Sequence, residues 1–133
     1  MDFKLEGAIG GHGKKRKTLG GAAVIQMRTG VPFSSFTLAP RLQWDKQIIP
    51  GHAIYLNTSL TVGYRMTTYS GAGLAALAYG YHGGMASFGW GVSAIVADRL
   101  LLSFRPVNPE IEVNGLTGFS INWDVFGGLG VIW

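Results

Sequence analysis

Three histidines are the residues with the most obvious capacity for chemistry. His12, His52 and His82 fall in or beside predicted connections that, on the strand assignment below, share one end of the molecule. With Asp45 nearby, imidazoles on one rim could hold a metal ion or support acyl transfer. The alternative is three unrelated histidines on three hairpins, which we favour because a site requires a mutual geometry that no motif here encodes. The sequence therefore assigns no catalytic residue, no metal ligand and no cofactor.

The basic run GKKRK at 13–17 is a second candidate site. Its cations are Lys14, Lys15, Arg16 and Lys17. They could bind lipopolysaccharide phosphates if this loop faces outward, and the alternative is a solvated hairpin tip. The surrounding segment is not a phosphate loop, because Ala8 replaces the first required glycine and Lys15 the final Ser or Thr. Nucleic acid is not expected as a partner, since no aromatic residues are interleaved with the charges.

Scattered charges within otherwise uncharged segments form a third group. The principal members are Glu6, Arg28, Arg41, Arg65 and Asp124, with Lys4 and Arg105 on the same face. They could line a pore as a selectivity ring, or they could pair with one another inside a plugged barrel. A barrel of eight strands leaves little free bore, so we predict a paired barrel-interior polar network.

The composition limits the class of protein that must position these residues. Hydrophobic residues make up 47% of the 133 residues and charged residues 14%, with 21 glycines and no cysteine. Soluble domains carry about 25% charged residues. Length predicts a single domain over 1–133, and the lack of cysteine excludes disulfides and thiolate metal sites. The start MDFKLEG has charges where a signal peptide is apolar, so we expect a mature exported region, or a phage-encoded or engineered chain.

A period of two residues recurs along the chain and predicts strands. In the clearest segment, AIYLNTSLTVGYR, apolar Ile54, Leu56 and Leu60 alternate with polar Asn57, Ser59 and Thr61. The pattern occurs in eight segments, which lie within 2–9, 18–28, 35–44, 53–65, 73–82, 87–96, 99–105 and 118–133. Pro40 interrupts the third segment, where we expect a bulge or a locally broken pair.

The predicted connections differ in length at the two ends. The longer and polar ones are GGHGKKRK, DKQIIPGH and PVNPEIEVNG, the shorter ones are TGVPFS, TTYSGAG and ADR, and HGGMA is short but belongs to the longer series. Long loops at one end and short turns at the other are typical of outer-membrane barrels.

The two faces of the strands decide between a soluble and a membrane barrel. The polar face is mostly Gly, Ala, Ser, Thr, Asn and Gln, whereas a soluble surface should be dense in charge. The other face carries Leu, Ile, Val and Phe, with Trp44, Trp90, Trp123 and Trp133 as candidate interface anchors. We therefore predict an all-β, eight-stranded antiparallel up-and-down transmembrane β-barrel with short connections. A soluble lipocalin-like barrel binding an apolar ligand, and a membrane helix within 71–97, are the alternatives.

Two stretches resemble known families. The ending WDVFGGLGVIW, with its final Trp133, resembles the signature by which the bacterial outer-membrane assembly machinery recognises its substrates, and the whole chain is similar in plan to the small barrels of the OmpA and OmpX type. The segment ASFGWGVSAIVADRLLLSFRPVNPE resembles the end of the lipid A palmitoyltransferase barrel. That family's catalytic loop residues are not matched here, so no catalytic role is carried over.

These resemblances imply a bacterial outer-membrane location and a structural or surface-interaction role. The implied partners are membrane lipid, lipopolysaccharide at the basic loop, and the assembly machinery through the strand that ends in Trp133. We expect a monomer. A lipid A-modifying acyltransferase is the alternative function.

Overall fold

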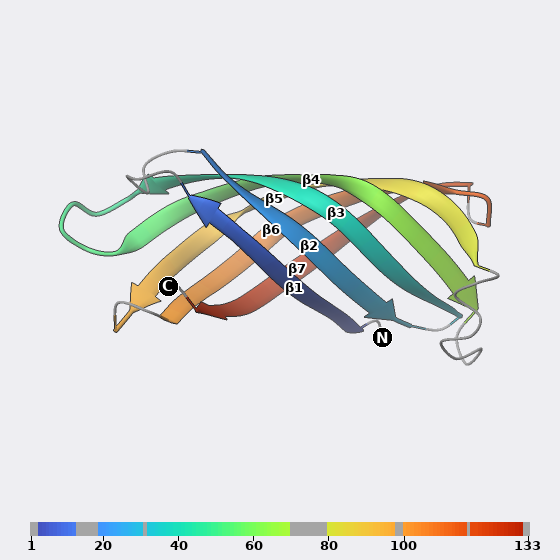
Figure 1. The fold of residues 1–133 in the computed structure, drawn as a ribbon, viewed down its shortest axis with the longest axis horizontal. Helices are drawn as coiled ribbons and strands as arrows, with labels where there is room; N and C mark the ends of the chain where they lie inside the picture. Colours follow the sequence, from blue (N-terminus) through green and yellow to red (C-terminus); the bar gives the residue numbers. More distant parts are fainter. Residues whose placement is uncertain are drawn as a thin grey trace.

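The computed structural model describes residues 3–12, 19–30, 32–69, 80–97, 100–116 and 118–131. These residues form seven strands and no helix. The strands are β1 (Phe3–His12), β2 (Leu19–Thr29), β3 (Phe33–Gln47), β4 (Ile54–Tyr69), β5 (Tyr81–Val96), β6 (Leu100–Asn114) and β7 (Gly118–Val131). Each strand pairs antiparallel with the next in one strongly curved sheet (Figure 1).

The sheet is open between its first and last strands, which corrects the predicted closed barrel. Within the described strands no backbone ladder joins β1 to β7. Seven antiparallel strands leave β1 and β7 running in the same direction, as Figure 1 shows. Direct pairing of these two edges would therefore be parallel, whereas every ladder in the sheet is antiparallel.

The prediction of eight strands is wrong for the described sheet at the fifth segment. Most of predicted strand 73–82 lies outside the described residues, and β4 pairs directly with β5 from Thr67↔Tyr81 to Ile54↔Ala94. The predicted HGGMA connection belongs to β5 itself. A Cβ on Gly83 in this segment would lie 2.1 Å from the Val113 oxygen. Glycine is required there because two backbones approach closely.

The predicted PVNPEIEVNG connection is also wrong, because β6 continues through it to Asn114. Between Arg105 and Asn108, β6 contains one residue more than either neighbouring strand, which is a β-bulge. The bulge reverses the parity of the strand, so Arg105 and Glu110 both reach the enclosed face. A fixed period of two cannot follow such a reversal, and its prolines make the segment resemble a loop.

At Pro40 the structure forms a broken pair and no bulge. The β3–β4 ladder stops after Leu38↔Tyr64 and resumes in the same register at Arg41↔Thr61.

The connections do not sort by length as predicted. Connections 30–32, 70–80 and 115–117 share one end of the sheet, while 48–53 and 97–99 share the other.

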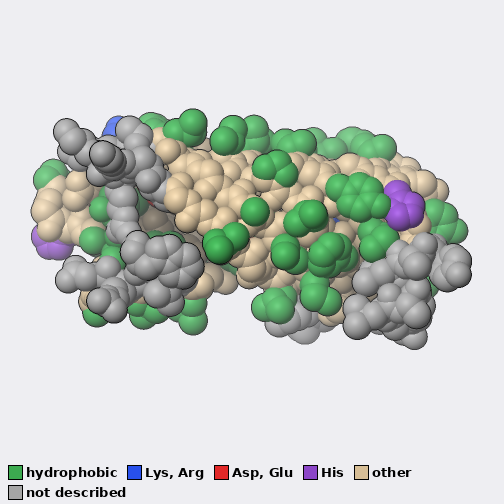
Figure 2. All heavy atoms as spheres, viewed as in Figure 1, with side chains coloured by type: hydrophobic (Ala, Val, Ile, Leu, Met, Phe, Trp, Pro, Cys, Tyr) green, Lys and Arg blue, Asp and Glu red, His purple; other side chains and the backbone are tan. Residues whose placement is uncertain are grey.

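Apolar side chains cover the outer face of the sheet. Leu60, Trp90 and Ile121 are 48%, 45% and 65% exposed. Figure 2 shows hydrophobic side chains along the length of one face, with no Asp or Glu among them. Among the described residues the buried apolar side chains are few, namely Val24, Ala39 and Met85. This distribution is the inverse of a soluble barrel and does not favour the lipocalin-like alternative.

The helical alternative within 71–97 is wrong where it can be examined, because 81–96 form β5. In the part of the chain that the structure describes, no helix has the length and apolar character needed to cross a membrane.

Candidate functional site

The enclosed face of the sheet carries almost all of the described charge. Strand alternation places Glu6, Arg28, Arg41, Arg65 and Asp124 on this face, from five different strands. Every described Asp, Glu, Lys and Arg side chain is buried or half-buried there except that of Lys46, which is exposed. The charged groups are therefore directed away from the apolar outer surface, and they meet in two clusters.

Glu110 on β6 is the centre of the first cluster and is fully buried. The Lys4 Nζ lies 3.0 Å from its Oε2, and the Arg28 Nη1 lies 3.5 Å from its Oε1. Arg65 donates a further hydrogen bond to the same Oε1. One carboxylate thus connects β6 with β1, β2 and β4, strands that are distant in the sheet.

Glu112 extends this cluster toward one end of the sheet. Its Oε2 accepts from Arg65 Nη1 at 2.8 Å, and its Oε1 accepts from Thr67 at 3.0 Å and from Asn114. Arg65 Nε donates to Thr37 at 2.8 Å. Arg65, which is 1% exposed, is held in place from three sides, so the cost of burying its charge is offset by partners.

Asp124 joins the two edge strands through side chains. It accepts from Lys4 Nζ at 2.8 Å and also from Arg28. Because Lys4 lies on β1 and Asp124 on β7, this ion pair links strands that share no backbone ladder.

Glu6 is the centre of the second cluster. Arg41 binds it with two nitrogens, Nη1 at 2.5 Å and Nη2 at 2.7 Å, in the bidentate geometry that favours Arg–carboxylate pairs. Arg105 Nη2 donates to the same carboxylate at 2.8 Å, and Gln26 donates at 2.7 Å. Arg41 Nε donates to Thr61 at 2.8 Å, so this cluster also connects several strands.

Among the described residues, the charges of the enclosed face balance. Its cationic side chains are Lys4, Arg28, Arg41, Arg65 and Arg105, and its anionic side chains are Glu6, Asp45, Glu110, Glu112 and Asp124. Asp45 accepts from Gln43 at 3.2 Å and from Asn57 at 2.5 Å. A set of charges that balance and bond to one another is expected in a filled interior. A pore that selects ions of one sign would instead carry an excess of the opposite charge.

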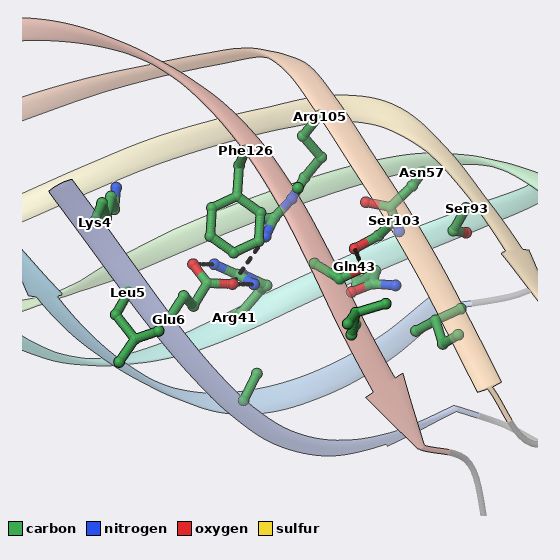
Figure 3. A pocket seen from close by; sticks show the side chains of 15 residues that line it. Lys4, Leu5, Glu6, Arg41, Gln43, Asn57, Ser93, Ser103, Arg105 and Phe126 are labelled. Carbon is green, nitrogen blue, oxygen red and sulfur yellow. Dashed lines mark hydrogen bonds and ion pairs between the residues drawn. The ribbon is translucent and has the colours of Figure 1, made fainter.

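A cavity of about 660 Å³ lies beside the Glu6 cluster. Figure 3 shows Glu6, Arg41 and Arg105 reaching toward one another from β1, β3 and β6. Phe126 of β7 lies against the Arg105 guanidinium, whose Cζ is 4.5 Å from the ring centroid. Gln43, Asn57, Ser93 and Ser103 make the rest of the lining polar on this side.

The histidines do not share one end of the sheet, although the sequence predicted that they would. His52 precedes β4, whereas His82 pairs with Met66 near the opposite end of the β4–β5 ladder. His82 Nδ1 hydrogen-bonds the Tyr64 hydroxyl on the exposed face. No cluster that could hold a metal ion occurs among the described residues. The three histidines therefore do not share one rim, because His82 lies near the opposite end of the sheet from His52 and from the end of β1 that carries His12.

Two predicted features lie outside the described residues, namely the basic run Lys14, Lys15, Arg16 and Lys17 and the terminal Trp133. The described tryptophans Trp44, Trp90 and Trp123 are all exposed on the outer face.

Sequence reasoning missed Glu110 and Glu112, although Glu110 receives more ion pairs than any other described acid. The alternation of Glu110, Glu112 and Asn114 with Ile111 and Val113 was a usable signal, hidden by the adjacent prolines. Comparisons with protein-family models, with curated proteins and with solved structures found no match, and the function is therefore inferred from the geometry of the chain itself.

Proposed function

We propose that this chain is a small integral β-sheet protein of a bacterial outer membrane, with a structural or surface-interaction role. The observation that supports it is the segregation of side chains: charged groups face inward and large apolar groups face outward. In water this arrangement would expose many apolar side chains while burying charges, which is unfavourable on both counts. In hydrocarbon it is the expected one.

The interior is proposed to be sealed rather than conducting. Ion pairs from β1, β2, β4, β6 and β7 meet at Glu110 and Asp124, and a second set meets at Glu6. Moving an ion past these groups would break several buried or half-buried ion pairs, which is costly. The polar network thus joins the strands through ion pairs between their side chains. We expect no ion current from the folded protein.

Surface interaction is assigned to the basic run Lys14–Lys17. This run lies between β1 and β2 in the sequence and outside the described residues. Four adjacent cations suit the phosphates of lipopolysaccharide. We expect replacement of all four with glutamine to weaken lipopolysaccharide binding without changing the folded fraction. Equal binding by both proteins would contradict this role.

Folding into detergent or lipid provides the primary test. The refolded chain should migrate differently on a gel before and after boiling, and lipids brominated along the acyl chain should quench Trp90 and Trp123 fluorescence. A protein that stays monodisperse without detergent, and whose tryptophans are not quenched, would contradict the membrane assignment. Planar bilayer recordings with no discrete conductance would agree with a sealed interior.

A further inference from the structure

The cavity beside Glu6 opens at the seam between the two edge strands. Its lining includes Leu5 of β1 and Leu129 of β7, which are 60% and 79% exposed on the outer face. Its opposite side consists of Glu6, Arg41 and Arg105 on the enclosed face. Figure 3 views the cavity with β1 and β7 in front of these charged side chains. One space therefore connects the apolar exterior to a polar, cationic interior.

The exposure of the rim supports an open seam. Leu60, on the outer face of central strand β4, is 48% exposed, considerably less than Leu5 or Leu129. A side chain on an edge strand lacks the neighbour that would cover one of its flanks. The seam is thus the place where the outer apolar surface is discontinuous.

The polar side of the cavity carries a local excess of positive charge. The single carboxylate of Glu6 lies between the guanidiniums of Arg41 and Arg105. Arg41 directs Nε, Nη1 and Nη2 to Thr61 and Glu6. By contrast, Arg105 donates through Nη2 alone within the described residues, and its face rests on Phe126. Arg105 is only 6% exposed and lines the cavity, and its remaining N–H donors are not enclosed by protein, so they are available to a ligand in this space.

We propose that this seam cavity binds a single-chain anionic amphiphile, an inference that rests on the membrane location proposed above. The carboxylate or phosphate headgroup accepts hydrogen bonds from Arg105, and the alkyl chain passes out between Leu5 and Leu129 into hydrocarbon. The volume, about 660 Å³, lies within the range of ordinary small-ligand sites, roughly 300–1,000 Å³. The negative charge of such a headgroup complements the excess of one guanidinium over Glu6.

The test uses the full chain refolded in a neutral maltoside detergent and shown to be heat-modifiable. Decyl phosphate, added below its own micelle-forming concentration, should bind saturably with one site per chain by isothermal titration calorimetry. Decanol, which has the chain without the charge, should bind at least tenfold more weakly. Inorganic phosphate, which has the charge without the chain, should fail to displace decyl phosphate at equal concentration. Equal binding of decanol, or full competition by inorganic phosphate, would overturn the proposal.

Two variants examine the geometry. Arg105→Gln should weaken decyl phosphate binding at least tenfold, while Lys46→Gln removes an exposed charge and should leave it unchanged. Ser103→Phe keeps every charge but places a bulky side chain in the cavity lining, so it should weaken binding at least tenfold, and it decides the question if Arg105→Gln does not fold. Unchanged affinity in Ser103→Phe overturns the site. A chain that needs no detergent contradicts the membrane location instead, so the two failures are distinguishable.

Discussion

Arg65 on β4 and Glu110 on β6 form an ion pair in which both side chains are almost completely enclosed, 1% and 0% exposed. The two residues are 45 positions apart and are separated in the sheet by the whole of β5. Their contact therefore spans the enclosed space rather than following a strand ladder. The ion pair thus joins β4 and β6 directly, although each of these strands forms its backbone ladder with β5.

Loss of the Glu110 carboxylate should strongly destabilise the fold. Glu110→Gln leaves Arg65, Lys4 and Arg28 with less negative charge in a buried setting, and breaking a buried pair costs about 3–5 kcal/mol. We expect a decrease in unfolding free energy of that size, measured by urea titration in lipid vesicles. Lys46→Gln removes a charge from the exposed face and should change it by less than about 0.5 kcal/mol. Similar values for the two variants would show that the network does not stabilise the sheet.

Alternation of residue types predicted the face that Glu6, Arg28, Arg41 and Arg65 occupy, because these residues lie on regularly alternating strands. It did not place Asp45 and Lys46, which belong to β3 although the sequence predicted a connection there. It missed Glu110, because the preceding bulge changes the parity within β6 and the alternation that includes Glu110 does not continue that of Arg105. The partners of each charge were also unpredictable. Lys4 and Asp124 are 120 positions apart, and only the curvature of the assembled sheet brings them together.

The β6 bulge leads to an unusual deletion experiment. Removing Pro106 eliminates the extra residue, so the β5 and β7 ladders become regular while Arg105 and Glu110 still face inward. We expect this deletion to fold, with a heat-modifiable band like that of the parent. Deleting Ile111 instead removes a residue from a regular ladder, turns Glu112 to the outer face and should prevent folding. Failure of the Pro106 deletion together with success of the Ile111 deletion would invalidate the register.

Two glycines on neighbouring strands provide a matched test of backbone packing. A Cβ at Gly63 would lie 2.3 Å from the Ala39 Cβ and 2.6 Å from the Leu38 oxygen, whereas at Gly84 the nearest atom is 4.0 Å away. Gly63→Ala should therefore cost about 1–3 kcal/mol of folding stability through overpacking. Gly84→Ala should be nearly neutral in the same urea titration. Equal effects would indicate that β3 and β4 are not so closely apposed.

The outward face offers the sharpest distinction between lipid and water. Val62 is near the middle of β4 and is 52% exposed, and its replacement by arginine would place a cation in the centre of the hydrocarbon layer. Such a substitution costs about 2–4 kcal/mol in a membrane barrel. We expect Val62→Arg to lose that much stability in lipid vesicles, while Val62→Thr, which keeps the size and β-branching, loses much less. On a soluble sheet the same arginine would be solvated and harmless, so a stable Val62→Arg protein would mean that this face meets water.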